Sequence, residues 1–260
     1  MKITDLFDVS GKVAVVTGGS RGIGEMIAEG LVTNGVRVYI TARKGAACDA
    51  TAERLSAVGE CISVPADLST ADGIETLATA VTEREDSLHI LVNNAGAAWG
   101  APIDEFPEAG FDKVLDVNLK APFMLTQRFL PLLRAAATVD DPARVIMTGS
   151  IDGIRVPNGD NFSYSASKAG IHMLARHMAH FLNTENITVN CIAPGPFDSK
   201  MMSYLLDDPK IRAGIEATVP LRRIGRPDDM AGAVLFLSSR AGSYLTGAVI
   251  PVDGGVSTHG

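Results

Sequence analysis

The chain has 260 residues, 46% of them hydrophobic, and a formal net charge of −7 at pH 7 with no basic cluster, which argues against a nucleic-acid partner. Its three cysteines form no Cys-x-x-Cys pair, so we expect neither a metal site nor a disulfide framework, and a reducing compartment fits best. Because no signal-peptide pattern or apolar run of membrane length occurs, we expect a cytoplasmic protein with no membrane partner.

Strands alternate with helices along the chain, which predicts a parallel sheet covered on both faces. The expected strands lie near 13–17, 37–41, 61–65, 88–93, 143–148, 187–193 and 248–252. The expected helices lie near 22–34, 46–57, 70–83, 107–134, 161–185 and 227–238. No repeat or linker interrupts this pattern, so we expect a single Rossmann-type, doubly wound α/β domain over residues 1–260 with a seven-stranded parallel sheet.

A glycine-rich turn joins the first expected strand to the first helix. It contains Gly18, Gly19, Gly22 and Gly24. Glycine lets the backbone turn tightly and lets a diphosphate approach the N–H groups at the helix start, where the helix dipole favours negative charge. The turn therefore predicts a dinucleotide site, with a purely structural strand–turn–helix as the alternative.

The end of the second strand predicts which dinucleotide is bound. NAD sites usually place an acid there for the ribose 2′-hydroxyl, whereas NADP sites use arginine for the 2′-phosphate. This chain has Ala42 at the position of the acid, Arg43 beside it and Arg21 inside the glycine turn. Either arginine alone could be a solvated surface charge, but the two together, without the acid, predict NADP(H).

Further segments also follow the carboxyl ends of expected strands, where open parallel sheets bind ligands. Asp67 closes the third strand and could contact a bound ligand. Alternatively, its side chain could cap the helix that begins near Thr70. The fourth strand runs into Asn93–Gly96, in which short side chains would let the strand end lie close to a cofactor, although Asn also builds structural turns. Pro194 and Gly195 follow the sixth strand.

Three residues predict an enzyme. Ser150 follows the fifth strand, and Tyr164 and Lys168 share one face of a helix because they stand four residues apart. Such a Tyr–Lys pair is common in helices, so its weight comes from its place among the other motifs. With nicotinamide as the hydride donor, Tyr164 can protonate a developing alkoxide, Lys168 can stabilise the phenolate, and Ser150 can donate a hydrogen bond to the carbonyl oxygen.

These motifs, in this order, resemble the short-chain dehydrogenase/reductase family over nearly the whole chain. The resemblance is strongest to bacterial 3-oxoacyl-[acyl-carrier-protein] reductases, especially the rhamnolipid-pathway ketoreductase type. That type shares the Arg134–Arg144 segment, the Asn93–Gly100 run and a Ser150-to-Tyr164 spacing one residue longer than in most members.

The resemblance implies roles for further residues. Asn118 would anchor a water in the proton path and join Ser150, Tyr164 and Lys168 in the catalytic set. Asp67 would face the adenine amino group, and Ser199, where Thr is usual, the nicotinamide carboxamide. The implied NADP(H)-binding set comprises Gly18, Ser20, Arg21, Gly22, Ile23, Gly24, Arg43, Asp67, Leu68, Asn94, Ala95, Gly96, Tyr164, Lys168, Pro194, Gly195 and Ser199.

The resemblance also implies a substrate lid over about 197–217, whose Met201, Met202, Tyr204, Leu205 and Leu206 would offer an adaptable apolar surface. Trp99, Ile154 and Val156 could complete an apolar pocket, with ordinary core residues as the alternative. The helix over 107–134 is apolar almost all round, which predicts burial on both sides and, in this family, pairing between subunits in a homotetramer or dimer.

The leading hypothesis is an NADPH-dependent carbonyl reductase acting on a 3-oxoacyl thioester or a similar small-molecule ketone. The alternatives are an NAD(P)-dependent dehydrogenase of a secondary alcohol or polyol, and a non-catalytic NADP(H)-binding regulator. Reductases of carrier-protein substrates present basic residues near the ends of the two central helices, where this chain has Asp140, Asp141 and Glu185 but keeps Arg134 and Arg144. The sequence therefore leaves carrier-protein and CoA thioesters both open.

Overall fold

The computed structural model describes residues 2–198 and 207–258. Within these residues, seven strands form one all-parallel sheet in the order β3-β2-β1-β4-β5-β6-β7. The strands are β1 Val13–Thr17, β2 Arg37–Thr41, β3 Cys61–Ser63, β4 Ile90–Asn93, β5 Ala143–Thr148, β6 Ile187–Pro194 and β7 Val249–Val252. The predicted fold class, a doubly wound seven-stranded parallel sheet, is confirmed.

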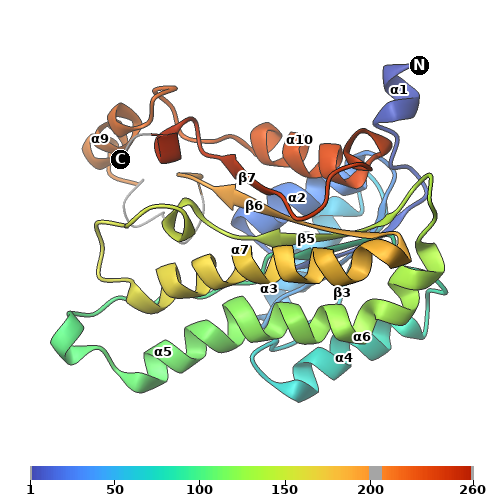
Figure 1. Cartoon of the computed structure of the whole chain (residues 1–260), viewed down its shortest axis with the longest axis horizontal. Helices are drawn as coiled ribbons and strands as arrows, with labels where there is room; N and C mark the ends of the chain where they lie inside the picture. Colours follow the sequence, from blue (N-terminus) through green and yellow to red (C-terminus); the bar gives the residue numbers. More distant parts are fainter. Residues whose placement is uncertain (1, 199–206, 259–260) are drawn as a thin grey trace.

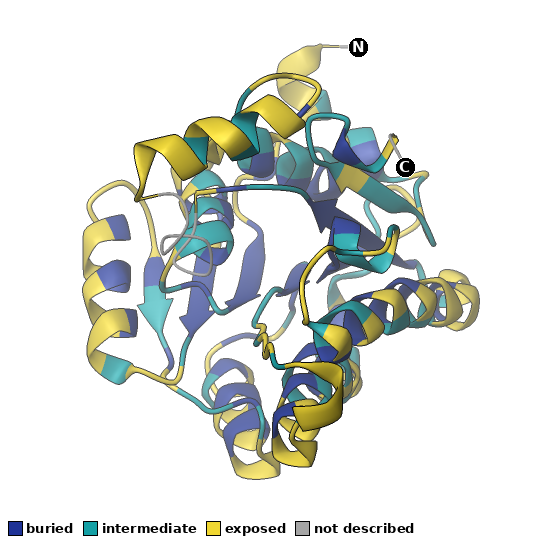
Figure 2. Ribbon diagram, turned by 90° about the vertical axis from the view of Figure 1, so that its left-hand side faces the viewer, coloured by how far each residue is buried: buried dark blue, intermediate teal, exposed yellow. Residues whose placement is uncertain are grey.

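Helices cover both faces of the sheet (Figure 1). One face carries α2 (Gly22–Thr33), α3 (Gly45–Leu55) and α10 (Pro227–Ser238), and the other carries α4 (Ala71–Thr82), α6 (Ala121–Ala136) and α7 (Phe162–Leu182). Alternate residues of a strand serve the two faces, as Val15 and Val16 of β1 do. Figure 2 shows the strands buried between helices that expose only their outer sides.

The long helix expected over 107–134 is interrupted. α5 (Glu108–Leu115) and α6 are separated by a π-helical turn over Asp116–Lys120, which carries Asn118. In a π-helical turn the backbone bonds skip one residue further, which shifts the faces of the flanking helices relative to each other. As a result the apolar residues do not all lie inside the chain, and Phe111 and Phe123 are exposed.

Two α-helices lie outside the predicted set, at α1 (Ile3–Leu6) and α9 (Pro209–Thr218). α9 begins with Asp208, whose side chain accepts the N–H groups of Lys210 and Ile211, followed by proline, and both are typical of a helix start. α9 occupies the second half of the expected lid. Residues 199–206 of the first half, including Ser199 and Met201–Leu206, lie outside the described residues.

Short 3₁₀ turns complete the described chain: η1 Ile103–Glu105, η3 Ile151–Gly153, η4 Asn183–Glu185, η5 Arg240–Gly242 and η6 Val256–Thr258. No described helix has both the length and the apolar content that crossing a membrane would require. The cysteines Cys48, Cys61 and Cys191 are free and buried. Among the described residues, no three His, Cys, Asp or Glu side chains gather as a metal site would require.

Candidate active site

The glycine turn between β1 and α2 is shaped by close backbone approach. Gly18 and Gly22 have φ of 67° and 55°, in the left-handed region that favours glycine. A Cβ on Gly24 would collide with the Gly18 carbonyl and the Asn94 amide. Arg21 stands at the N-cap of α2 without a side-chain cap, so the first N–H groups of the helix remain suited to a phosphate. The glycines therefore have a structural role in the turn, and phosphate binding by the helix start is compatible with that role and stays a prediction.

Asn94 ties this turn to the segment that follows β4. The Thr17 hydroxyl accepts the N–H groups of Asn94 and Ala95, each at 2.9 Å. The Asn94 side chain returns a hydrogen bond to the Thr17 carbonyl, also at 2.9 Å. Gly96 faces Asn118 and Lys168, both within 4 Å of where its Cβ would stand. The predicted cofactor segments from β1 and β4 thus lie side by side.

Arg43 lies at the same edge of the sheet. Thr17 and Thr41 are paired in the β1–β2 register, and Gly19 donates to the Thr41 carbonyl at 3.2 Å, so the glycine turn and the end of β2 are adjacent. Arg21 and Arg43 are both exposed, and within the described parts of the chain neither has an ion-pair partner. Two unpaired guanidinium groups beside a phosphate-binding turn fit the 2′-phosphate of NADP(H).

Asp67 does not cap α4. The cap is Thr70, whose hydroxyl accepts the Gly73 N–H at 3.0 Å, so the capping alternative for Asp67 is wrong. Asp67 instead accepts the backbone and hydroxyl of Ser69. Burial acts to raise the pKa of Asp67, but these hydrogen bonds and the charges of Arg43 and Lys113 hold it below its ordinary value. An ionised Asp67 beside Arg43 is compatible with the predicted adenine contact, which stays a prediction.

Other predicted cofactor residues are placed around this edge. Leu68 is 5% exposed and packs in the core, so only its backbone is available to a ligand. Ser20 and Ile23 are half-buried in the glycine turn. Gly195 lies against Asp253 and donates to the Val252 carbonyl at 3.0 Å, directly after Pro194 ends β6.

Ser150, Tyr164 and Lys168 converge at the end of β5. Lys168 is 4% exposed, donates to the Thr148 carbonyl at 2.7 Å, and has its Nζ 5.5 Å from the centre of the Tyr164 ring. The Ser150 hydroxyl accepts the Asp152 N–H at 3.1 Å, which leaves its own proton free to be donated. The Ser150 hydroxyl also lies close enough to Tyr164 to lower the pKa of its phenol, against the larger effect of burial. The three residues predicted to be catalytic are therefore brought together.

The charge states of this set follow from burial. Burial raises the pKa of Tyr164 to about 12, the Ser150 hydroxyl opposes this rise, and Asp152 adds to it. Burial lowers the pKa of Lys168 to about 8. Near neutral pH the pair therefore consists of a neutral phenol and a buried ammonium, which is the arrangement a proton donor needs.

Asn118 joins three elements. Its amide nitrogen donates to the Ala97 carbonyl at 2.9 Å and to the Ser167 hydroxyl at 3.0 Å, and its oxygen accepts the Ala97 N–H at 2.8 Å. The amide thereby fixes the π-helical turn to α7 and to the loop after β4. Both amide protons are used, so a bound water would have to use the Asn118 oxygen or backbone, and that role stays a prediction.

Arg134 and Arg144 do not form a basic surface. Arg144 is 1% exposed and donates to the carbonyls of Leu237 and Ser239, while Arg134 pairs with Glu185. The expectation that Arg144 remains available for docking is wrong, because the residue ties the start of β5 to the end of α10.

The sequence analysis did not identify His172, a buried residue behind Ser150. Its position one helical turn after Lys168 could have indicated that it lies near the site.

Comparison with known proteins shows the family to which the chain belongs. Residues 18–257 match the family model described as enoyl-(acyl carrier protein) reductase. The chain is 47% identical to the rhamnolipids biosynthesis 3-oxoacyl-[acyl-carrier-protein] reductase of Pseudomonas aeruginosa, over 96% of this chain and 97% of that protein. It is 36% identical to the 3-oxoacyl-[acyl-carrier-protein] reductase MabA of Mycobacterium tuberculosis, over 93% of this chain and 91% of that protein. The solved P. aeruginosa RhlG/NADP active-site complex is similar, with a TM-score of 0.95 and 47% identity over 97% of this chain and 99% of that one.

Proposed function

Since the chain belongs to the short-chain dehydrogenase/reductase family, we propose that it is an NADPH-dependent carbonyl reductase of 3-oxoacyl thioesters. The observation that carries this proposal is the convergence of Ser150, Tyr164 and Lys168 beside the glycine turn. A sequence identity of 47% to a 3-oxoacyl-[acyl-carrier-protein] reductase supports the substrate class.

The residues of the chain divide the work as follows. The turn at Gly18–Gly24 holds the diphosphate, Arg21 and Arg43 bind the 2′-phosphate, and Lys168 binds a ribose hydroxyl. NADPH, when bound, supplies the hydride. Tyr164 donates its proton to the carbonyl oxygen of the substrate, Ser150 donates a hydrogen bond to the same oxygen, and the Lys168 ammonium stabilises the phenolate that remains.

Exposed apolar side chains support an acyl substrate. The loop after β5 exposes Ile154 and Val156, at 45% and 86%, and the loop after β4 exposes Trp99 at 38%. These loops meet, because Ala101 donates to the Asp160 carbonyl at 3.2 Å. We propose that these loops line the substrate entrance, and that residues 197–217 act as its lid within one domain spanning 1–260.

The substrate is tested by following NADPH oxidation with acetoacetyl-CoA, the matching carrier-protein thioester and a small diketone, and NADP⁺ reduction with polyols. Turnover of either thioester supports the proposal, and comparison of the two thioesters assigns the carrier. Turnover of polyols alone would favour the dehydrogenase alternative. Tight NADPH binding with no turnover of any compound would favour the non-catalytic regulator.

We expect a preference for NADPH over NADH of more than about tenfold in kcat/KM, because each charge-assisted phosphate contact contributes about 1.5–3 kcal/mol. The double variant Ala42→Asp, Arg43→Ile should shift the preference toward NADH, because it supplies an acid for the 2′-hydroxyl and removes one cation. Steady-state kinetics with both cofactors measure the ratio. Arg54→Ile, which changes an arginine already paired with Glu25, is the matched control. Equal use of both cofactors by the unaltered protein would contradict the assignment.

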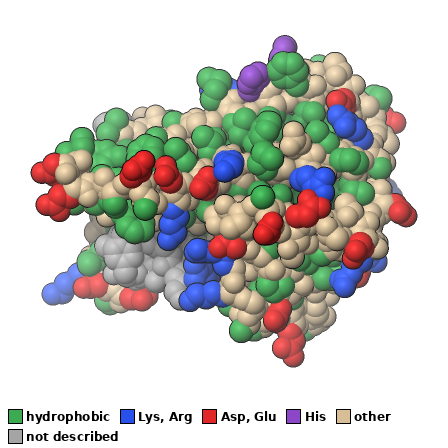
Figure 3. All heavy atoms as spheres, turned by 90° about the horizontal axis from the view of Figure 1, so that it is seen from below, with side chains coloured by type: hydrophobic (Ala, Val, Ile, Leu, Met, Phe, Trp, Pro, Cys, Tyr) green, Lys and Arg blue, Asp and Glu red, His purple; other side chains and the backbone are tan. Residues whose placement is uncertain are grey.

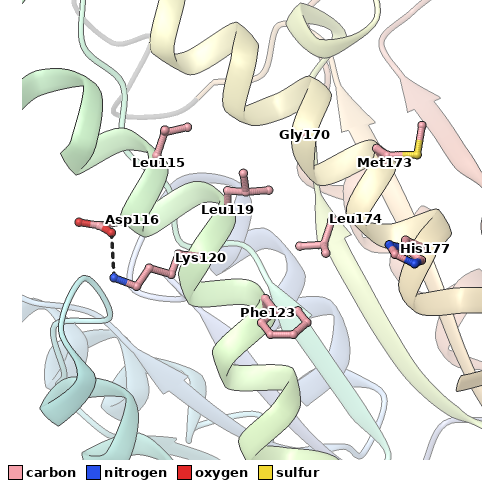
Figure 4. A pocket seen from close by; sticks show the side chains of 9 residues that line it. All are labelled: Leu115, Asp116, Leu119, Lys120, Phe123, Gly170, Met173, Leu174 and His177. Carbon is pink, nitrogen blue, oxygen red and sulfur yellow. Dashed lines mark hydrogen bonds and ion pairs between the residues drawn. The ribbon is translucent and has the colours of Figure 1, made fainter. Parts of the chain in front are cut away.

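We propose that subunits pair through a groove between α7 and the segment formed by α5, the π-helical turn and α6. The groove encloses about 590 Å³. Figure 4 shows Leu119 and Phe123 on one wall and Met173 and Leu174 on the other, with Asp116 and Lys120 bonded to each other at the rim. Phe123 and Met173 are 42% and 61% exposed, and hydrophobic side chains gather on this side of the molecule (Figure 3). Such an exposed apolar surface marks an interface, here a homotetramer or dimer.

Met173→Asp should dissociate the oligomer at micromolar concentration, because a carboxylate cannot be buried in an apolar interface without a partner. Sedimentation velocity measures the mass. Val58→Asp places the same charge on an exposed valine at the end of α3 and should leave the mass unchanged. A monomer already present in the unaltered protein would remove the proposal.

We also assign the protein to the cytoplasm. Buried, free cysteines at all three positions support a reducing compartment.

A further inference from the structure

His172 lies directly behind the Ser150 backbone. It is 6% exposed and stands on α7 one helical turn after Lys168. The Ser150 N–H donates to its Nε2 at 3.4 Å. The preceding residue, Gly149, still donates to the Ile192 carbonyl of β6 at 2.7 Å. The N–H of Ser150 is therefore the first in this segment that has no carbonyl of β6 as its acceptor. The Nε2 atom of His172 accepts its hydrogen bond instead.

The ring packs against the backbone that it bonds. A Cβ on Gly149 would collide with Nε2 of His172 and would lie 2.8 Å from Sγ of Cys191. Only glycine at position 149 leaves room for the imidazole. The strand end and the His172 ring are thus complementary in shape as well as in hydrogen bonding.

The same ring contacts the other end of the turn that follows Ser150. The Gly153 backbone lies close enough to the ring to raise the pKa of His172, against the larger effect of burial. Gly153 packs against the backbone of α7. A Cβ on Gly153 would stand 2.6 Å from the carbonyl carbon of Lys168. Inside the turn, the Ser150 hydroxyl accepts the Asp152 N–H at 3.1 Å. His172 is therefore hydrogen-bonded to the first end of the η3 turn and lies near the other end, while the Asp152 N–H of the turn orients the Ser150 hydroxyl.

The surroundings keep the imidazole neutral. Burial lowers the pKa of His172, and the nearby charges of Lys168 and Arg176 lower it further, to about 4. The remaining titratable neighbour is Cys191 of β6, whose thiol is kept protonated because burial raises its pKa to about 12. A neutral ring offers an acceptor nitrogen, which is what the Ser150 N–H requires.

We propose that His172 is a positioning residue for the reaction: it accepts the Ser150 N–H, packs against Gly149 and so aims the Ser150 hydroxyl at the substrate oxygen. The inference rests on the proposed carbonyl reductase function. It also makes a structural statement about Ser150 that does not depend on turnover.

The test compares His172→Leu with His172→Gln. Leucine fills the space but leaves the Ser150 N–H without an acceptor, so kcat should fall at least about tenfold, whereas the dissociation constant of NADPH should stay within about twofold. The glutamine side-chain oxygen can accept the same N–H and should restore much of kcat. His180→Leu, at an exposed position of the same helix, is the matched control and should leave kcat unchanged.

A double-mutant cycle separates positioning from general packing. Because the effect of His172 passes through the Ser150 hydroxyl, adding His172→Leu to Ser150→Ala should lower kcat by less than about twofold further. An equal fold-loss in both backgrounds would overturn the inference, as would full activity in His172→Leu. Melting temperatures of all variants show whether each one folds.

Amide hydrogen exchange gives a readout without turnover. The Ser150 amide should be protected in the unaltered protein and in His172→Gln, and should exchange much faster in His172→Leu. Unchanged exchange in His172→Leu would overturn the contact itself. Absence of any carbonyl reduction by the unaltered protein would instead contradict the proposed function, so the two failures are distinguishable.

Discussion

Tyr164→Phe is expected to lower carbonyl turnover by about 10²–10⁴-fold, the usual contribution of general acid catalysis. Phenylalanine keeps the ring that packs near Lys168 and removes only the hydroxyl. Burial raises the pKa of the Tyr164 phenol to about 12, so the group is protonated throughout the neutral range and ready to donate. Removing it leaves Ser150 to polarise the carbonyl with no proton to transfer.

Three measurements on Tyr164→Phe distinguish the possible roles of the residue. A catalytic role predicts a fall in kcat with NADPH affinity and melting temperature nearly unchanged, because Arg43 and the glycine turn are untouched. A structural role predicts a lower melting temperature with activity retained. Ser165→Ala, the adjacent position, is a matched control, since its hydroxyl bonds only to the Phe162 carbonyl among the described residues. Reduction of ketones by Tyr164→Phe at a near-native rate would contradict the mechanism.

Lys168→Met is expected to damage the enzyme twice, through the ribose contact and through the charge that stabilises the phenolate. Turnover should fall by about 10²-fold or more, and the affinity for NADPH should also decrease. Burial lowers the pKa of Lys168 to about 8, so the side chain is charged below that pH and neutral above it. In the unaltered protein, kcat/KM for reduction should therefore be highest below pH 8 and decline as the pH rises through 8.

The pH profiles of variants identify the group. Lys168→Arg keeps a positive charge at every working pH, so whatever activity it retains should not decline near pH 8. Persistence of the decline in Lys168→Arg would assign it to a different residue.

The lowered pKa of Lys168 also has a consequence for the stability of the protein. Between about 8 and the ordinary value of 10.5 the folded protein binds fewer protons than the unfolded chain, so the contribution of Lys168 to stability increases with pH across that window.

The strands and the candidate site could largely be predicted from local patterns. Each strand is a short apolar run that ends at a polar or glycine-rich segment, and each observed strand boundary lies within two residues of its expected position. The strand order could not be predicted in this way, because it depends on pairings such as that of β1 with β4. The π-helical turn at Asp116–Lys120 was missed because one added residue leaves the apolar pattern on either side intact.

The residues that were misjudged share one cause, which is tertiary environment. Arg144 carries the positive charge that a docking residue needs, but its side chain is buried and donates to backbone carbonyls at the end of α10. Asp67 and Thr70 are both good cap residues, and only the path of the chain decides between them. In the sequence, nothing distinguishes His172 from other helical histidines. Its role becomes visible only when α7 is packed against the end of β5.

The bond between Thr17 and Asn94 has a consequence for how the protein folds. These residues stand 77 positions apart, and their contact forms only when β1 pairs with β4 across the centre of the sheet. Because closing a loop of this length costs entropy before the contact is made, we expect the Thr17–Asn94 contact to form late in folding, and we expect the unfolded chain to bind the nucleotide far more weakly than the folded protein. The free energy of nucleotide binding therefore stabilises the native state relative to the unfolded chain. At a nucleotide concentration 100 times the dissociation constant this amounts to about 2.7 kcal/mol, so the cellular NADPH pool acts as a stabilising agent for the protein as well as its reductant.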